Sequence, residues 1–417
     1  MTTLAEPPTL WRNRDFLRFW FGESLSLLGT QVTTLALPLT AIHAFGASDS
    51  EVGVLRFLQL APYLGLALIF GVWVDRARRR RVMLGANLVR MVLLALIPVL
   101  HWLDLLSLPS LLAMACAIGI ASVLYDVSWM SYVPVLVEDP RHYVEASSKL
   151  AVSSSAADVA GPGLAGLLIS WLTAPVALIA DACSYLLSAI SLLLIRKAEP
   201  RPDPALRRPV AAELRDGLRW VFGTPVLRAL ALIGCCCNFS MITVWTMFLL
   251  YATNDLQLGA QTLGLIFATA SAGGLLGAGL ARRIVARFPV GRVYLIAQSL
   301  LLLGPTLLVI APGTWVAMFV LSFFVTYLGL GVAGVIIVSL RQLSTPQAMM
   351  GRMTAVFRTL LFGGGALGGL SAGLLAEALG ARGALTVAAI GSAIVVVAVF
   401  LSPVARLRRL PDPALEA

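Results

Sequence analysis

The chain has 417 residues, of which 59% are hydrophobic and only 12% are charged, and its formal net charge is +10. Soluble domains average about 25% charged residues and about 45–50% apolar ones. The composition therefore excludes an ordinary soluble protein. It indicates a membrane protein with room for about a dozen helical spans of about 20 residues each.

Twelve apolar segments follow one another along the chain. Most are longer than the roughly 9–11 residues of a transmembrane barrel strand, and they lack strict alternation. Helices satisfy their own backbone hydrogen bonds in lipid, so twelve transmembrane helices are predicted. The segments have the approximate limits 16–44, 52–73, 82–103, 109–137, 145–172, 174–195, 225–252, 261–285, 292–311, 313–340, 352–379 and 383–404.

The basic residues gather on one side of the predicted membrane. With a cytoplasmic N-terminus and alternating segments, 28 of the 31 Lys and Arg residues fall in or beside cytoplasmic intervals. By the positive-inside rule, this bias predicts that both termini are cytoplasmic in a protein of the cell (inner) membrane. The bias also accounts for the net positive charge, so nucleic-acid binding is not predicted.

The two halves of the chain resemble each other. GPGLAGLL at 161–168 and GGLSAGLL at 368–375 are identical at five of eight positions. We therefore predict an all-α integral membrane fold of two pseudo-symmetric six-helix bundles, 1–195 and 225–417, joined by a cytoplasmic linker at 196–224. Internal repeats of this kind are typical of secondary transporters, which bind substrate at the repeat interface.

The sequence GVWVDRARRRRVM at 71–83 falls in the short interval after the second segment. It resembles the loop signature G-x-x-x-D-R-x-G-R-R/K of the major facilitator superfamily, with Arg78 in place of the second glycine. The runs SLLGTQVTTLALPL and DVSWMSYVPVLVEDPRHYVEASSKL resemble the exporter branch that includes macrolide-efflux and enterobactin-exporter proteins. The loop residues that match the signature are Gly71, Asp75, Arg76, Arg79 and Arg80.

A simple positive-inside stop explains the arginines of this loop but not its glycine or its acid. Small residues let membrane helices approach closely, so Gly71 is predicted at a close helix contact. Asp75 lies just past a helix C-terminus, where the helix dipole does not favour an anion. It needs cationic partners, and the loop is therefore predicted to be a gate whose ion pairs break and reform as the helices move.

The segment 145–172 contains ADVAGPGLAG at 157–166. This run resembles the antiporter motif of exporters through Gly161, Pro162 and Gly166. Pro162 cannot donate a hydrogen bond to the carbonyl group of Asp158, so the helix should bend at that residue. The motif is equally compatible with close helix packing and with a role in coupling.

Several ionisable residues lie inside the predicted spans. A charge at the bilayer centre costs at least ~2.5 kcal/mol, so each should face the protein interior with a partner. Glu23 and Asp158 are the preferred proton carriers, whereas Arg90 and Asp126 lie at depths compatible with an ion pair. The proton-coupling candidates are Glu23, Asp158, Asp126, Asp181 and Arg90, and Arg56 is a further charge within a span.

The family resemblance implies that the first, fourth, seventh and tenth segments line a central cavity. Polar residues of the first segment recur on one helical face, and aromatic residues recur in the other three. A wide apolar cavity with few polar anchors suits amphipathic molecules of drug size. The cavity candidates are Ser26, Thr30, Thr33, Tyr125, Trp129, Tyr132, Asn238, Met241, Trp245, Phe323, Thr326 and Tyr327.

The sequence carries no signature of an enzyme or a metal site. The five cysteines lack metal or disulfide spacing, and nucleotide-binding and hydrolase motifs are missing, so no cofactor, metal or catalytic residue is predicted. The sequence predicts a monomeric secondary exporter that exchanges protons for amphipathic small molecules such as drugs, macrolides or siderophores. A lysophospholipid flippase or a solute uptake symporter of the same fold is the alternative within transport. A membrane-embedded receptor or enzyme is the alternative from another class.

Overall fold

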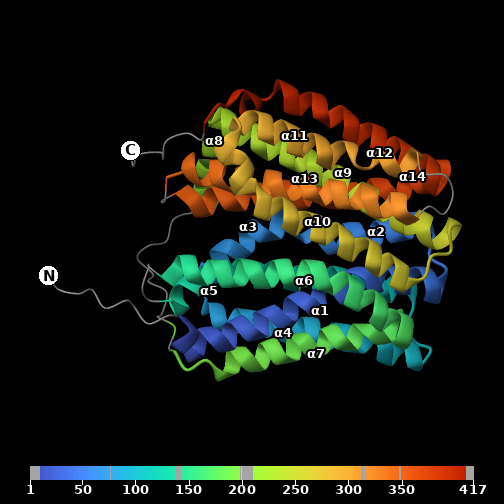
Figure 1. The fold of residues 1–417 in the computed structure, drawn as a ribbon. Coiled ribbons are helices and arrows are strands. Elements are labelled where there is room, and N and C mark those ends of the chain that lie inside the picture. Colours follow the sequence, from blue (N-terminus) through green and yellow to red (C-terminus); the bar gives the residue numbers. More distant parts are fainter. Residues whose placement is uncertain are drawn as a thin grey trace.

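The computed structural model describes residues 10–75, 77–137, 142–197, 199, 210–310, 316–346 and 349–409. These described residues form helices and no β-strand. Among them, ten helical stretches are long and apolar enough to cross a membrane, and they lie side by side along one direction (Figure 1). The stretches are formed by α1 (Arg14–Phe45), α4 (Arg79–Trp102), α5 (Leu108–Leu136), α6 (Tyr143–Leu172), α7 (Ala174–Leu194), α9 (Pro225–Leu250), α10 (Ala260–Arg287), α11 (Val290–Leu303) with α12 (Thr306–Ile310), α13 (Val316–Leu343) and α14 (Met350–Leu401).

Two of the predicted segments differ from single unbroken helices. Segment 52–73 is covered by α2 (Asp49–Leu60) and α3 (Pro62–Asp75), because Pro62 has no amide hydrogen to continue the helix. Segments 352–379 and 383–404 both fall within α14. They meet at Gly380, whose φ of 70° and ψ of 159° interrupt the helix and favour a glycine.

The predicted linker contains a packed helix. α8 (Val210–Gly223) lies against α14 and α3, and Asp216 of α8 forms an ion pair of 3.3 Å with Arg352 of α14. Three shorter helical turns adjoin the ends of α1, α9 and α14, namely η1 (Leu10–Arg12), η4 (Tyr251–Asp255) and η6 (Pro403–Arg406).

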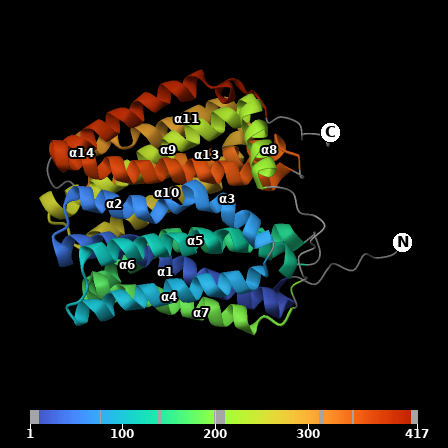
Figure 2. The same ribbon diagram turned by 180° about the vertical axis from the view of Figure 1, so that it is seen from behind.

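The helices from the two halves of the chain pack mainly with their own half. In the first helix group, α1–α7, α1 packs against α6 and α7, and α4 packs against α5 and α7. In the second helix group, α9–α14, α9 packs against α14, and α10 and α11 pack against α13. The groups meet through α2 with α14 and through α6 with α10 (Figures 1 and 2). α1 begins and α14 ends at the same end of the molecule, which we call the terminal end; the opposite end is the far end.

The buried core is shared between the groups in one half of the molecule and divided in the other. In the far half, one cluster includes Leu35 of α1, Leu55 of α2, Phe248 of α9 and Ala372 of α14. In the terminal half, the first group has its own cluster around Phe19 and Tyr132, and the second group has another around Tyr294 and Phe357. The two groups are therefore packed together most completely toward the far end.

Close backbone contacts reinforce this far-end packing. A Cβ atom on Gly53 of α2 would lie 2.7 Å from the Cα atom of Gly373 of α14. A Cβ atom on Gly166 of α6 would lie 2.5 Å from the carbonyl oxygen of Ala260 and 3.0 Å from the Cα atom of Gly264, both of α10. Only glycine allows the helices to approach this closely.

Replacing Gly166 with alanine should therefore destabilise the fold. The added methyl group would force α6 away from α10 and loosen the far-end core. Gly334→Ala is the matched control, because a Cβ atom at this α13 position would meet no described atom within 4 Å. Alanine is favoured over glycine by about 1 kcal/mol in a helix, so the control should be neutral or stabilising. Thermal unfolding in detergent measures both variants, and an equal melting temperature for Gly166→Ala and the wild type would contradict the packing argument.

Candidate substrate cavity and buried charge network

A cavity of about 350 Å³ lies between the two helix groups. Three helices supply its second-group wall, and α1 and α6 supply the opposite wall. The first-group residues are Gln31, Thr34, Leu35, Ser155, Asp158 and Pro162, and the second-group residues are Trp245, Phe267, Ser271, Gly274, Leu275, Ala278, Tyr327, Leu330 and Gly331. This volume falls within the usual range of small-molecule sites.

One acid and three aromatic rings dominate the chemistry of this cavity. The exposed carboxylate of Asp158 accepts a hydrogen bond of 2.8 Å from the side-chain amide of Gln31. Across the cavity, the rings of Trp245 and Phe267 are stacked with centroids 5.1 Å apart, and Tyr327 lies beside them in the wall. A carboxylate that faces aromatic rings can bind the charged and apolar parts of a cationic amphiphile.

Arg56 of α2 bridges the two groups behind the aromatic wall. Its guanidinium carbon lies 4.1 Å from the centroid of the Trp245 ring, and its Nη2 donates 3.1 Å to the carbonyl oxygen of Thr34 in α1. Trp245 is thus held between a cation on one helix and a phenyl ring on another. The contact fixes the ring that forms the cavity wall.

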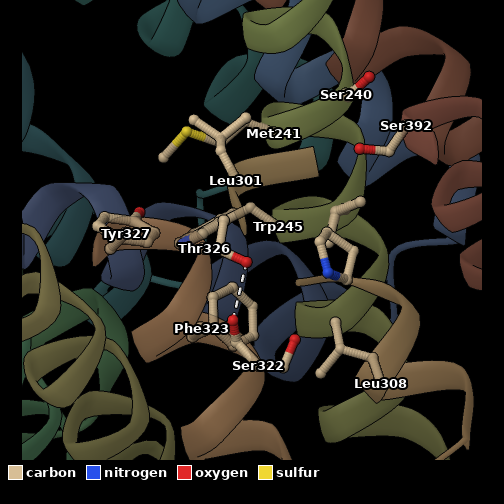
Figure 3. Close-up of a pocket in the computed structure, with 12 residues that line it drawn as sticks. Ser240, Met241, Trp245, Leu301, Leu308, Ser322, Phe323, Thr326, Tyr327 and Ser392 are labelled. Atoms are coloured by element: carbon tan, nitrogen blue, oxygen red, sulfur yellow. Dashed lines mark hydrogen bonds between the residues drawn. The ribbon is translucent and has the colours of Figure 1, made fainter. Parts of the chain in front are cut away.

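A second, water-sized void of about 20 Å³ lies inside the second group (Figure 3). Figure 3 shows Met241, Trp245, Phe323 and Tyr327 around it, together with Thr326, whose hydroxyl group donates 2.8 Å to the carbonyl oxygen of Ser322. The void holds at most one water molecule, so it is packing around Trp245 and Tyr327 rather than a second substrate site.

A network of buried charges lies within the first group. Arg90 of α4 stacks between the rings of Tyr125 and Tyr185, with centroid distances of 4.3 and 4.1 Å. Tyr125 donates a hydrogen bond to Glu23, which is only 7% exposed. Asp181 is fully buried on α7.

Further hydrogen bonds hold Asp181 and Arg90 within this network. Asp181 accepts hydrogen bonds from the hydroxyl groups of Thr33 and Ser184, the latter at 2.8 Å. Asn87 accepts a hydrogen bond from Arg90 and donates 2.9 Å to Ser188 of α7. The two buried acids are therefore each hydrogen-bonded, and one arginine lies within electrostatic reach of both.

Asp126 belongs to a contact between the groups instead. It accepts a hydrogen bond of 2.7 Å from the hydroxyl group of Tyr63 in α3 and forms an ion pair of 3.9 Å with Arg358 of α14. The ring of Tyr63 stacks on Phe362 of α14 with a centroid distance of 4.1 Å. We call these four residues the α3–α14 latch. The predicted pair of Asp126 with Arg90 is thus replaced by a pair with Arg358.

The model of the transmembrane secretion effector family, a branch of the major facilitator superfamily, matches residues 7–414. The chain belongs to this family. It is similar to the multidrug efflux pump Tap of Mycolicibacterium fortuitum, with 28% identity over 397 residues that cover 92% of this chain and 93% of that pump. The Tap pump of Mycobacterium tuberculosis (strain ATCC 25618 / H37Rv) is 24% identical over 368 residues, 86% of each chain.

Solved structures agree with the major facilitator fold. An inward-facing, unoccupied bacterial homologue of the human lysosomal transporter Spinster has a TM-score of 0.73 at 17% identity, covering 96% of this chain and 98% of its own. An inward-facing bacterial homologue of the iron transporter ferroportin has a TM-score of 0.74 at 16% identity, covering 93% and 98%. The predictions of a major facilitator protein and of a transporter rather than an enzyme are confirmed.

The gate motif of this secretion effector is only partly described. Arg76 and the side chain of Asp75 lie outside the described residues, so the predicted ion pairs of Asp75 remain a prediction. The predicted close contact at Gly71 is wrong for this structure, because a Cβ atom there would meet no described atom within 4 Å.

The remaining gate residues join two helix ends to the linker. Arg80 donates hydrogen bonds of 2.7 and 2.9 Å to the carbonyl oxygens of Leu192 and Leu193 near the end of α7. The backbone amides of Arg79 and Arg80 donate 2.8 and 3.2 Å to Glu199, which satisfies the start of α4. These contacts tie the start of α4 to the end of α7 and to the linker.

The predicted cavity residues divide by helix group. Among the first-group candidates, Thr33 contacts Asp181, and the hydroxyl group of Thr30 lies 3.1 Å from that of Tyr185. Ser26 is buried, and Tyr125 belongs to the charge network. Trp129 and Tyr132 pack in the terminal core. Among the second-group candidates, Trp245 and Tyr327 line the large cavity. The small void is lined by the same two residues and by Met241, Phe323 and Thr326. Asn238 donates a hydrogen bond to the carbonyl oxygen of Leu361 instead. The polar stripe of α1 therefore faces the charge network, and its neighbours Gln31 and Thr34 face the cavity.

The antiporter-like motif of Gly161, Pro162 and Gly166 lies where α6 meets its neighbours. Pro162 lines the cavity, Gly161 contacts the Gln31 side chain of α1, and Gly166 contacts α10. Sequence reasoning missed the cavity residue Gln31 and the latch residues Tyr63 and Phe362. The sequence carries no signal for Gln31, because only the structure shows that Gln31, Thr34 and Leu35 lie on the cavity side of α1.

The far-end contact at Asp49 predicts that separation of the two groups at this end depends on pH. Asp49 accepts a hydrogen bond of 3.1 Å from Asn254 of η4, which joins the two groups. Burial, followed by the nearby carboxylates of Asp255 and Glu377, raises the pKa of Asp49 above its usual 3.8, against a smaller opposing effect of the Asn254 hydrogen bond. Asp49 thus binds a proton more tightly when the far end is closed than when that end is open and the carboxylate is hydrated. Low pH favours closure, and this preference is lost as the pH rises through the raised pKa.

Asp49→Asn should therefore make far-end opening less dependent on pH. Distances between spin labels at Leu105 and Leu379, measured by pulsed electron resonance over a pH series, report the opening. Asp104→Asn, at an exposed acid of the same end, is the control and should keep the wild-type dependence. A pH dependence in Asp49→Asn equal to that of the wild type would rule out this role for Asp49.

Proposed function

We propose that this transporter is a proton-coupled exporter of amphipathic small molecules that works by alternating access. The observation that carries the proposal is the cavity between the groups, where the Asp158 carboxylate faces an aromatic wall. A carboxylate in this position can hold either a proton or a cationic substrate, which is what an antiporter requires. The similarity to Tap multidrug efflux pumps supports drugs as the substrate class.

The proposal includes twelve spans in two six-helix halves, 1–195 and 225–417, acting as a monomer. α2 and α3 together make one span, α14 makes two at its Gly380 break, and the nine other candidate stretches make one each. In this arrangement the halves correspond to the first and second helix groups, and the cavity lies at their interface.

The terminal end is proposed to face the cytoplasm. Arginines gather there around α3 and α4, around α10 and α11, and along α8. The positive-inside rule then makes the far end the outer face. With the core shared at the far end and divided at the terminal end, the structure fits a conformation closed to the outside, as in the inward-facing relatives.

Labelling of single cysteines tests this orientation. In a variant without the five native cysteines, Ser48→Cys should react in intact cells with a thiol reagent that cannot cross the membrane. Arg287→Cys at the terminal end should react only after permeabilisation. Both positions are exposed in the structure, so burial would not explain a failure to react. Labelling of Arg287→Cys in intact cells would reverse the proposed topology.

Two sites could carry the proton. Asp158 lies in the cavity itself, one helical turn before Pro162 and in hydrogen-bond contact with Gln31. Glu23 belongs to the charge network, where Arg90 lies between two buried acids, Glu23 and Asp181. Asp126, paired with Arg358, also acts on Arg90 and Glu23, so three acids stand against two arginines and one proton would balance the charge. A proton on Glu23 or Asp181 and substrate at Asp158 can then be linked through movement of the first group.

Neutral variants separate transport from proton coupling. Glu23→Gln or Asp158→Asn should abolish substrate accumulation driven by a pH gradient in everted vesicles, because the amide cannot release and rebind a proton. Exchange of substrate between equal pools should persist with Glu23→Gln, since alternation with bound substrate does not need the proton. Asp104→Asn should accumulate substrate as the wild type does.

The outcomes distinguish the proposed function from its alternatives. If both variants pump at wild-type rate, neither acid is essential and the coupling residues would have to be sought at Asp126 or Asp181. Accumulation by the wild type only under the opposite gradient would favour a solute uptake symporter of the same fold.

A further inference from the structure

We infer that the central cavity binds zwitterionic amphiphiles, which carry a cationic group at one end of an apolar body and an anionic group at the other. Asp158 is the partner of the cationic group, and Arg56 of α2 is the partner of the anionic group. The inference rests on the proposed export function and specifies its substrate class. Arg56 takes part in neither the charge network of the first group nor the α3–α14 latch.

Arg56 has no acid partner among the described residues. Its Nη1 donates 3.2 Å to the side-chain oxygen of Gln59, and its Nη2 donates 3.1 Å to the carbonyl oxygen of Thr34, so both acceptors are neutral. Its Nε is buried and has no hydrogen-bond partner in the described part of the chain. An arginine stays protonated in a protein. A charge within a membrane protein is costly, and its position there marks a functional site. Arg56 therefore offers a positive charge and a free donor to a partner that the described residues do not supply.

The helices packed around Arg56 present neutral groups to it. The guanidinium carbon lies 4.1 Å from the centroid of the Trp245 ring of α9. The hydroxyl group of Tyr327 in α13 lies within electrostatic reach. On α14, a Cβ atom on Gly369 would lie 2.8 Å from the Cβ atom of Arg56, so the backbone itself passes beside the arginine.

The acids nearest to Arg56 in the sequence and on the neighbouring α5 have other contacts. Asp49 and Glu51 lie at the far-end start of α2, where each accepts a hydrogen bond. Asp126 of α5 belongs to the α3–α14 latch. None of these three carboxylates therefore serves as the counter-ion of Arg56.

α1 holds Arg56 and Asp158 against its cavity face. The side chain of Gln31 donates a hydrogen bond to Asp158, and the carbonyl oxygen of Thr34 accepts one from Arg56. Gln31 and Thr34 both line the cavity, and three residues correspond to about 4.5 Å along a helix. The two opposite charges thus lie at similar depths, with Arg56 slightly nearer the far end.

The aromatic wall lies between the two charges. Tyr327 lines the cavity and is within electrostatic reach of both Asp158 and Arg56. Trp245 lines the same wall and covers the face of the guanidinium group. A ring system that lies along this wall would place one end near each charge.

This arrangement favours a zwitterion over a simple cation. A monocation satisfies Asp158 but leaves Arg56 without a counter-ion in a poorly hydrated site, whereas a zwitterion satisfies both charges. A carboxylate is a stronger acceptor for a guanidinium group than the neutral oxygen of Gln59, so it can replace that contact. Arg56 is therefore a specificity-determining residue of the cavity.

Two probes that differ only in the anionic group test the inference. Ciprofloxacin carries a piperazine ammonium group and a carboxylate at opposite ends of its ring system, whereas its methyl ester carries the ammonium group alone. Binding of each to the purified protein in detergent is measured by fluorescence anisotropy at neutral pH, with a chelator to exclude metal bridges. The wild type should bind ciprofloxacin about tenfold or more tightly than the ester, as expected for a hydrogen bond between charged groups.

Arg56→Gln should remove this preference, because glutamine keeps a donor for the Thr34 carbonyl oxygen but carries no charge. Its affinity for ciprofloxacin should fall about tenfold or more, while its affinity for the ester stays equal or rises. Arg56→Lys keeps the charge and should retain most of the preference. Arg382→Gln removes an exposed arginine near the Gly380 break and is the matched control, which should bind both compounds as the wild type does.

An equal loss of both compounds in Arg56→Gln would show that Arg56 only holds the Trp245 ring, and would overturn the inference. An Arg56→Lys variant that behaves like Arg56→Gln would overturn it too. The comparison in the wild type needs no substitution, so it decides the matter even if Arg56→Gln does not fold. A wild type that binds the ester as tightly as ciprofloxacin, or binds neither, would overturn the inference.

Failure of the proposed function is a separate result. A wild type that binds ciprofloxacin with the expected preference, but accumulates neither compound in vesicles under either pH gradient, would overturn proton-coupled export. The assignment of Arg56 and Asp158 to the two ends of a zwitterion would stand.

Discussion

The packing of the two helix groups in the far half of the molecule is the constraint on which the rest of the structure depends. There a single buried core runs through α1, α2, α9 and α14, and glycines bring α2 to α14 and α6 to α10 at backbone distance. At these glycine contacts no side chain can change its rotamer to make room. The two groups can therefore separate at this end only by moving as rigid bodies. The terminal half has a separate core in each group, with a smaller cluster around Tyr63 and Phe362 between them, so each group can move there without opening its own main core. A difference of this kind between the two ends is what a rocking transporter needs.

The distribution of charge gives the two groups different tasks under the proposed function. The first group buries Glu23, Arg90 and Asp181 with tyrosine and hydroxyl partners, and removing one partner of a buried charge typically costs about 3–5 kcal/mol. Such a network is stable only while every member keeps its contacts, so a proton gained or lost by one acid acts on α1, α4, α5 and α7 together. The second group offers aromatic rings to the cavity instead. Proton chemistry and substrate shape are thus assigned to different groups, and Asp158 is the acid that stands where they meet.

The sequence predicted the helices well because length and apolar content decide whether a segment can cross a membrane. It also located the aromatic residues of the second group that line the cavity, whereas the predicted bend at Asp158 stays a prediction, because α6 runs as one helix from Tyr143 to Leu172. It failed where the answer depends on helix rotation. The stripe of Glu23, Ser26, Thr30 and Thr33 is a true polar face, but periodicity cannot say which neighbour that face meets, and it meets α5 and α7. Asp126 pairs with Arg358 rather than Arg90 because the partner comes from the other half of the chain, at a distance in sequence that no local pattern records.

The two contacts between the groups differ in what must break for the terminal end to open or close. On the α3–α14 side, an ion pair and a ring stack join the groups, and both are specific in geometry. On the α6–α10 side, the corresponding depth is a groove of about 870 Å³ between Val159 and α10, and Leu275 lines both this groove and the cavity. Closing the groove would bring Val159 toward α10, whereas the latch would hold the opposite side as a hinge. Under the proposed function, a bulky molecule held at Asp158 would set how far that movement proceeds.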